Sequence, residues 1–318
     1  MTVLAVVEPN TLKGTELRQE LRQHRELWSE VRLLSRESDD ETATLSELDG
    51  AALVQPLSAE ALAGVHLSFI CGDYDEASPP WALAGDGSTT VLVSPERSPP
   101  GGIPVVSGVN PEAAVAGGLL VSPHPAVVLL ALLLDPLRSL GIAEAAAWLV
   151  QPATMRGRRG MDELMAQTRA LLVFSDERPT DVFGQQLTFN LLPTGEATEP
   201  LADEVAGLLG AAVTPAIEIV QGAVFHSFTA SVLVGFETDP GSEAIEAALD
   251  AQPLLEPHDP KAPPGPGPIA AAGRNKVLLG PVAPVSGQPG RYWLRAVMDN
   301  LTRGGAVNAL EIAAAALG

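Results

Sequence analysis

Short apolar runs alternate with polar and helical segments over the first part of the chain. These runs predict strands at 3–7, 31–34, 67–70, 90–93 and 119–121. After the first run, Leu17, Leu21 and Trp28 recur at helical spacing and predict a helix. Strands separated by helical or Pro- and Gly-rich segments are typical of a parallel sheet covered by helices. We therefore expect an α/β domain with a doubly wound, Rossmann-like fold.

The pattern changes at Pro125. The uniformly apolar segment that follows, 126–134, predicts a buried helix that is too short to span a bilayer. Further periodic segments predict strands at 145–150, within 218–236 and at 292–297, and helices at 161–172 and 305–317. The alternation within 218–236 is typical of half-buried antiparallel strands. We expect an α+β second domain over 123–299, and a first domain formed by 1–122 and 300–318.

Residues 252–268 read QPLLEPHDPKAPPGPGP. Proline removes a backbone donor and fixes φ, so a segment this rich in Pro and Gly disfavours both helix and sheet. We expect a surface loop without regular structure.

The composition excludes several classes of partner. A formal net charge of −20 over 318 residues repels phosphate backbones and anionic headgroups, so we expect neither a nucleic-acid nor a membrane partner. The single cysteine, Cys71, excludes an internal disulfide and a cysteine-based zinc cluster, and we expect no metal. The first residues lack the basic region and cleavage site of a secretory signal. These features predict a cytoplasmic protein.

Four motifs resemble those of the aspartate-semialdehyde dehydrogenase family. They are RYWLRAVMDNLTRGGAVNALEIAAAAL at 291–317, GMDEL at 160–164, FNLLP at 189–193 and FHS at 225–227. Their order and spacing agree with the family over nearly the whole chain. The resemblance implies a first domain that binds NADP, and a second domain that carries catalysis and the dimer interface and matches the expected α+β domain.

The cofactor loop departs from the family pattern. Members use G-x-x-G-x-x-G, so that the backbone approaches the pyrophosphate at a helix N-terminus. Residues 8–14 read EPNTLKG here, and only Gly14 remains. Glu8 would place a carboxylate where an anion must lie. We expect no bound cofactor, with Gly14, Asn300 and Gly304 as the remaining candidates for NADP contacts if one is bound.

The catalytic positions depart as well. The family's nucleophilic cysteine aligns with Pro125, which has no nucleophilic atom, and its substrate-binding arginine aligns with Ile219. Gln151 and His226 match the family's active-site glutamine and general base, and each is equally interpretable as a structural pocket residue. Cys71 is a conceivable displaced nucleophile, although a buried strand-end thiol is common. The resemblance therefore implies no catalytic residues.

Two further features stay open. Arg156, Arg158 and Arg159 form the strongest local positive charge, and they indicate either a solvated loop or a site for an anion or an acidic partner. His124 precedes Pro125 and is either a substitute base or, as we expect, a half-buried structural histidine.

The simplest hypothesis is a pseudoenzyme. It resembles the Usg-type relatives of the family, which also lack the cysteine, and acts as a dimeric structural or regulatory interaction protein. The partner is then a second copy, or another enzyme subunit in a heteromer. Two alternatives remain: an NADP-dependent semialdehyde dehydrogenase with a rebuilt site, and a sensor that binds a small ligand.

Overall fold

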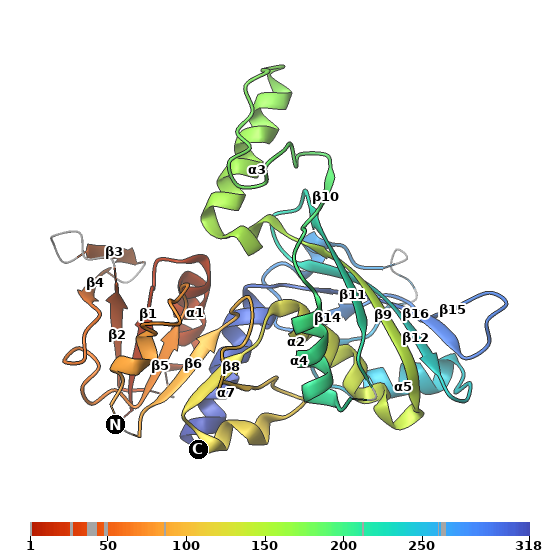
Figure 1. Cartoon of the computed structure of the whole chain (residues 1–318), viewed down its shortest axis with the longest axis horizontal. Coiled ribbons are helices and arrows are strands. Elements are labelled where there is room, and N and C mark those ends of the chain that lie inside the picture. Colours follow the sequence, from red (N-terminus) through yellow and green to blue (C-terminus); the bar gives the residue numbers. More distant parts are fainter. Residues whose placement is uncertain are drawn as a thin grey trace. The chain divides into compact units, whose positions relative to one another are not determined.

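The computed structural model describes residues 2–25, 28–36, 43–47, 50–85, 87–211, 213–259, 261 and 265–318. The chain forms two compact units (Figure 1). The first unit comprises Met1–His124 and Gly305–Gly318, and the second comprises Pro125–Gly304. Each unit contains its own sheet, and the two sheets are described separately below.

The first unit contains a sheet in the order β3-β4-β2-β1-β5-β6-β8-β7. All neighbouring strands pair in parallel except β3, which is antiparallel to β4. The strands are β1 (Val3–Val7), β2 (Glu30–Ser35), β3 (Ala43–Glu47), β4 (Gly50–Pro56), β5 (Leu67–Ile70), β6 (Thr89–Val93), β7 (Ile103–Pro104) and β8 (Leu119–Ser122). Strands β1, β2, β5, β6 and β8 confirm the predicted parallel α/β sheet.

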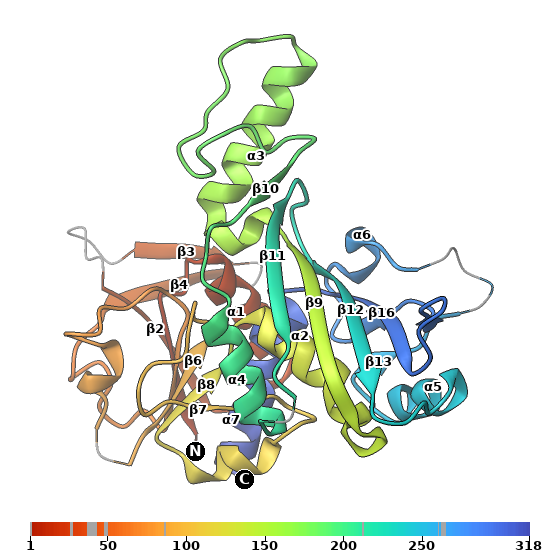
Figure 2. The same ribbon diagram turned by 45° about the vertical axis from the view of Figure 1, so that its right-hand side comes forward.

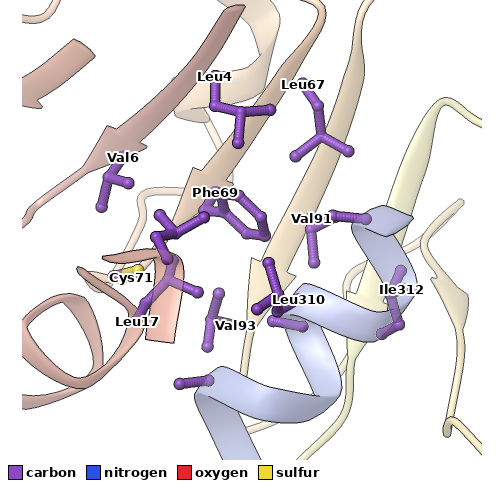
Figure 3. Packing of buried hydrophobic residues seen from close by; sticks show 14 of the residues in the cluster. Leu4, Val6, Leu17, Leu67, Phe69, Cys71, Val91, Val93, Leu310 and Ile312 are labelled. Carbon is purple, nitrogen blue, oxygen red and sulfur yellow. The ribbon is translucent and has the colours of Figure 1, made fainter. Parts of the chain in front are cut away.

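Helices α1 (Leu12–Gln23) and α7 (Asn308–Leu317) cover one face of this sheet. Figure 3 shows Leu17 from α1 and Leu310 from α7 packed with Phe69 of β5 in one buried cluster. The prediction that α1 extends to Trp28 was wrong. The helix ends at Gln23, and the His24 N–H donates to the Leu21 carbonyl at 3.2 Å. Trp28, which lies beyond the end of the helix, packs against the same core.

Helix α7 is anchored by one buried asparagine. The Asn308 side chain is fully buried, and its Oδ1 accepts from the Ser107 N–H at 2.9 Å. Its Nδ2 lies 3.0 Å from the Val105 carbonyl and 2.9 Å from the Ser122 hydroxyl. The helix was expected to begin at 305. Instead a π-helical segment, Thr302–Val307, precedes it.

The second unit contains a mixed sheet in the order β10-β11-β9-β12-β16-β14-β13, with β15 paired to β16. The strands are β9 (Ile142–Gln151), β10 (Leu191–Pro193), β11 (Ala216–Gly222), β12 (Phe228–Phe236), β13 (Leu255–Glu256), β14 (Val277–Leu279), β15 (Ala283–Pro284) and β16 (Arg291–Met298). The helices are α2 (Pro125–Leu134), α3 (Gly157–Leu172), α4 (Glu199–Leu209), α5 (Ser242–Asp250) and α6 (Pro268–Ala271). This unit has the predicted α+β character.

Two predictions for this unit need correction. Strands β11 and β12 do not pair with each other, because β9 lies between them. Strand β11 is therefore parallel to β9, and only β12 is antiparallel to it. The segment 252–268 is also not without regular structure. It contains β13, which has no proline of its own and pairs in parallel with β14.

Side chains of helix α3 form hydrogen bonds with the backbone of the long connection that follows the helix. The helix begins at Gly157, four residues before the predicted start, and projects from the sheet of its own unit (Figures 1 and 2). The Glu163 carboxylate accepts from the backbone N–H groups of Val182 and Phe183 at 2.7 and 3.1 Å. The Gln167 amide oxygen accepts from the Leu187 N–H at 2.7 Å. Two buried side chains thus fix the backbone of the connection.

Among the helices that the structure describes, none is long and apolar enough to cross a membrane.

We predict that Asn308→Leu lowers the free energy of unfolding by about 2–4 kcal/mol, because it leaves several buried polar partners unsatisfied. Urea unfolding measures the change. Leu317→Ala is the matched control at the exposed end of the same helix, since Leu317 is 38% exposed, and its effect should be small. Equal destabilisation by the two variants would contradict the anchoring role of Asn308.

Candidate functional site

The loop that follows β1 packs tightly against the first turn of α1. Glu8 has φ 59°, in the left-handed region that glycine adopts most readily. Gly14 in α1 lies directly behind this loop, and a Cβ there would be 2.5 Å from the Glu8 carbonyl oxygen. Gly14 therefore allows the helix and the loop to approach each other closely, and this packing alone accounts for the glycine.

The Glu8 side chain crosses the carboxyl end of the sheet. Its carboxylate accepts from the Arg36 N–H at 2.8 Å and from the Ser35 hydroxyl at 3.1 Å, both at the end of β2. Its stem lies over Gly72, where a Cβ would be 2.5 Å from the Glu8 Cγ. Strands β1, β2 and β5 are neighbours, and the carboxyl ends of such strands are where doubly wound folds bind nucleotides. A pyrophosphate here would meet a carboxylate.

The remaining polar groups of the loop are bound to the protein itself. The Thr11 hydroxyl accepts from the Gly14 N–H at 3.0 Å and so caps the first turn of α1. Arg18 Nε donates to the Pro9 carbonyl at 3.1 Å. Lys13 Nζ donates to the Ser94 carbonyl at 2.7 Å. The helix N-terminus that would bind phosphate in the family is thus capped by the chain's own threonine.

Burial shifts the pKa values of three chemistry-bearing groups near this edge. Cys71 is 1% exposed and lies in the core cluster, and burial raises the pKa of its thiol to about 12 (Figure 3). Burial also lowers the pKa of Lys13, against the nearby charges of Asp73 and Glu96. His124 is 6% exposed rather than half-buried as expected. Burial and the Lys13 charge lower the pKa of His124 to about 3, so it is neutral at pH 7.

Pro125 begins α2, and every residue of that helix is buried. A Cβ on Gly304 would lie 3.0 Å from the Pro125 Cβ and 2.7 Å from the Met298 Cε. The proline ring thus stands in a packed environment that only a glycine at 304 permits. Gly304, predicted as a candidate for cofactor contact, has a sufficient packing reason.

Asn300, the other predicted cofactor contact, is a structural clamp within the second unit. It is 2% exposed, and its Oδ1 accepts from the Ser227 N–H at 3.1 Å. Its Nδ2 donates to the Thr154 hydroxyl at 3.1 Å. Ser227 has φ 75°, and its buried hydroxyl has no hydrogen-bond partner. Asn300 thus ties the turn that contains the half-buried His226 to the segment after β9.

Gln151 is paired with a residue that the sequence did not reveal. Strands β9 and β11 place Gln151 beside Gln221, and the Gln151 Nε2 donates to the Gln221 Oε1 at 3.1 Å. The Gln221 Nε2 donates back to the Gln151 carbonyl at 3.1 Å. Both glutamines are buried. Only the parallel register of β9 and β11, which periodicity did not predict, could have found Gln221.

Ile219 lies on β11 opposite Leu149, and both side chains are buried. The position that aligns with the family's substrate-binding arginine is therefore part of the core. An aliphatic side chain has no donor for a carboxylate.

The predicted arginine cluster is divided in the structure. Arg156 forms an ion pair with Glu196, whereas Arg158 and Arg159 are exposed in the first turn of α3. Among the described residues, no three His, Cys, Asp or Glu side chains gather to hold a metal ion.

No protein-family model matches the chain. An aspartate-semialdehyde dehydrogenase of Rickettsia bellii is 25% identical over 207 residues, which are 61% of this chain and 61% of that enzyme. Aspartate-semialdehyde dehydrogenase II of Vibrio cholerae, solved in complex with ASA, matches this chain with a TM-score of 0.89 at 22% identity. The match covers 99% of this chain and 98% of the Vibrio cholerae chain. A probable aspartate-semialdehyde dehydrogenase of Pseudomonas aeruginosa has a TM-score of 0.86 at 23% identity, over 98% and 97% of the two chains.

Sequence and fold relate this chain to the aspartate-semialdehyde dehydrogenases. The two-unit α/β architecture agrees with that of the solved dehydrogenases over nearly their full length. The sequence match is shorter, since it spans about 61% of the length of the Rickettsia bellii relative.

We predict that His124 makes the fold less stable in acid. Its ordinary pKa of 6.5 applies to the unfolded chain, whereas the folded value is about 3. Below pH 6.5 the unfolded state binds a proton that the folded state does not, so stability falls as the pH falls toward 3. Between pH 7 and 5 the wild type should lose about 2 kcal/mol more than His124→Gln in urea unfolding. Equal losses in the two proteins would contradict a buried, neutral His124.

Proposed function

We propose that this chain is a catalytically inactive member of the aspartate-semialdehyde dehydrogenase family that acts as a dimeric structural or regulatory interaction protein. The observation that carries the proposal is Pro125. The motif resemblance aligns this residue with the family's cysteine; it begins the buried α2, and it offers no nucleophilic atom. In hydrolases, loss of a covalent nucleophile lowers turnover by a factor on the order of 10⁶.

Changes at two independent places support the same conclusion. The Glu8 carboxylate bonds to the end of β2 and lies over Gly72, so the crevice does not fit a pyrophosphate. Ile219 is buried in the core, so the substrate carboxylate lacks its arginine. Each change acts on a different part of the reaction, and restoring one does not restore the others.

The retained family residues have structural roles that need no catalysis. Gly14 and Gly304 permit close backbone packing, and Asn300 ties two turns together by buried hydrogen bonds. Gln151 pairs with Gln221. Their retention is therefore compatible with loss of the reaction, because folding alone depends on them.

We predict that the purified protein has no dehydrogenase activity on aspartate semialdehyde with NADP and phosphate. About 1 mM NADP should also leave its melting temperature unchanged, because only a ligand that binds the native state stabilises it. Spectrophotometry at 340 nm and a thermal-shift series measure the two outcomes. The Vibrio cholerae enzyme serves as the positive control.

The variant Pro125→Cys tests whether the change at Pro125 alone accounts for the expected inactivity, or whether Glu8 and Ile219 also contribute. It reinstates the sulfur, but it should remain inactive because Glu8 and Ile219 are unchanged. Hydride transfer by the wild type, or a melting shift with NADP, would refute the proposal and favour a working dehydrogenase.

We propose further that the chain forms a homodimer through the exposed face of the second unit's sheet. Trp148 of β9 and Trp293 of β16 are 42% and 38% exposed, whereas their strand neighbours Leu149 and Leu294 are buried. Leu233 of β12 pairs with Trp293 in the sheet. Exposed tryptophans on a regular sheet face are typical of protein interfaces.

We predict that the double variant Trp148→Glu/Trp293→Glu weakens the dimer by tenfold or more, because it places unpaired charges in the interface. Sedimentation velocity over a concentration series measures the effect. Ile269→Glu is the control, since Ile269 is 93% exposed in α6 and a charge there should change nothing. A wild-type monomer, or a variant that dimerises as well as the wild type, would contradict the proposed interface. In the former case a heteromer with another enzyme subunit becomes the better proposal.

The single cysteine is reduced and buried, which suits a reducing compartment, and we infer a cytoplasmic protein.

A further inference from the structure

A lysine lines a cavity at the carboxyl end of the first unit's sheet. Lys13 lies in the first turn of α1, and its half-buried side chain borders a cavity of about 310 Å³. The other walls come from the segments after β5 and β6, at 72–76 and 95–97. We call this space the Lys13 cavity. Among the described residues that line it, Lys13 is the one that carries an amine.

The Lys13 cavity has an apolar wall. Pro95 is buried and Tyr74 is half-buried, and both line the cavity. The Tyr74 ring packs edge-to-face against Trp81, with ring centroids 4.8 Å apart, and this contact holds the wall in position. A ligand with a small apolar body therefore finds a surface to contact beside the amine.

The rim of the cavity carries negative charge. Its exposed lining residues are Asp73, Glu76, Glu96 and Arg97. Arg97 pairs with Glu76 at 3.0 Å, so these two charges offset each other. The carboxylates of Asp73 and Glu96 remain, and both act on Lys13 through their charge. The rim therefore repels an anionic ligand and admits an uncharged one.

One hydrogen bond orients the Lys13 amine. Its Nζ donates to the Ser94 carbonyl at 2.7 Å. Ser94 is 5% exposed and has φ 47°, a left-handed conformation that is uncommon for a residue other than glycine. Strained backbone of this kind is concentrated at functional sites. The bond uses one N–H of the amine, so an unprotonated Lys13 still has its lone pair for a carbonyl carbon.

Burial makes the Lys13 amine easier to deprotonate. Removal from water lowers its pKa below 10.5, against the opposing effects of Asp73, the Cys71 thiol and Glu96. His124 is also within electrostatic reach of Lys13, and it is neutral at pH 7 because burial lowers its pKa to about 3. The unprotonated amine is the nucleophilic form, and lysines in desolvated pockets are activated in this way.

We propose that Lys13 is a covalent binding site for a small uncharged aldehyde, which it holds as a reversible imine. The Nζ lone pair attacks the carbonyl carbon, and the π electrons of the carbonyl move to its oxygen. A proton then passes from nitrogen to oxygen through water and gives a carbinolamine. Loss of that hydroxyl, together with the remaining proton of the nitrogen, releases water and leaves the C=N bond. Amine and aldehyde thus yield imine and water, without an oxidant or a cofactor.

This binding is independent of the proposed loss of dehydrogenase activity. That loss rests on Pro125, Glu8 and Ile219, and none of them lines the Lys13 cavity. Imine formation transfers no hydride, so the chain can bind an aldehyde that it does not oxidise. A regulatory protein would thereby respond to a ligand without consuming it.

The test compares lysines within one molecule. The lysines of the chain are Lys13, Lys261 and Lys276, and the last two are exposed in the second unit. The full chain is treated at about pH 7 with propanal and sodium cyanoborohydride, which reduces an imine to a stable propylamine. Peptide mass spectrometry then gives the labelling rate of each lysine. Lys13 should react about tenfold faster than Lys276. Without the reductant, the adduct should be lost on dilution.

Glyoxylate repeats the measurement with an aldehyde that carries a carboxylate. The ratio of Lys13 to Lys276 labelling cancels the different reactivities of the two aldehydes. This ratio should be at least about threefold lower for glyoxylate than for propanal, because the rim repels it. The variant Asp73→Asn/Glu96→Gln removes that repulsion and should raise the glyoxylate ratio more than the propanal ratio.

A melting measurement gives a readout that does not depend on labelling. Propanal at about 10 mM should raise the melting temperature of the wild type and of the control Lys276→Arg, but not that of Lys13→Arg. Labelling of Lys13 no faster than that of Lys276, an adduct that persists without the reductant, or equal ratios for the two aldehydes would each overturn the proposal. An equal melting shift in Lys13→Arg would do the same. The labelling comparison uses the wild type and requires no variant to fold.

Discussion

The segment that closes the chain after β16 is fixed by buried side-chain hydrogen bonds, and the rest of the fold depends on it. Asp299 accepts from the N–H groups of Leu301 and Thr302 and starts the turn that follows. Asn300 binds the Ser227 and Thr154 segments of the second unit, while Asn308 binds β8 and its neighbours in the first. The most family-like stretch of the sequence is therefore the one that organises both units.

The loop after β1, unlike the closing segment, departs from the glycine motif of the family. Glu8 has a backbone conformation suited to glycine and adds a negative charge to the loop. The non-glycine residue at this φ stores about 1 kcal/mol of strain. Two hydrogen bonds from the end of β2 offset it. Lys13 donates a hydrogen bond to a neighbouring carbonyl, and Thr11 accepts one from a neighbouring N–H group. These polar groups are therefore hydrogen-bonded within the protein itself.

Strands β1, β5, β6 and β8 of the first unit could be predicted from sequence because each is a short apolar run that is almost wholly buried. The end of α1 could not, since Trp28 continues the helical period and packs against the same core although the helix ends at Gln23. The parallel pairing of β11 with β9 was missed for a related reason. Periodicity reports which face of a strand is buried and carries no information on its neighbour. The Gln151–Gln221 pair arises from strand register, and the sequence therefore did not indicate it.

The burial of Cys71 has a consequence for chemical durability. Peroxides and mixed disulfides react with thiolates, and a thiol with a pKa of about 12 is ionised in roughly one molecule in a hundred thousand at pH 7. A dehydrogenase that acts through an ionised cysteine is open to inactivation by oxidants at that atom. This chain holds its single cysteine inside the core. The described residues of the first unit therefore offer oxidants no readily ionised thiol.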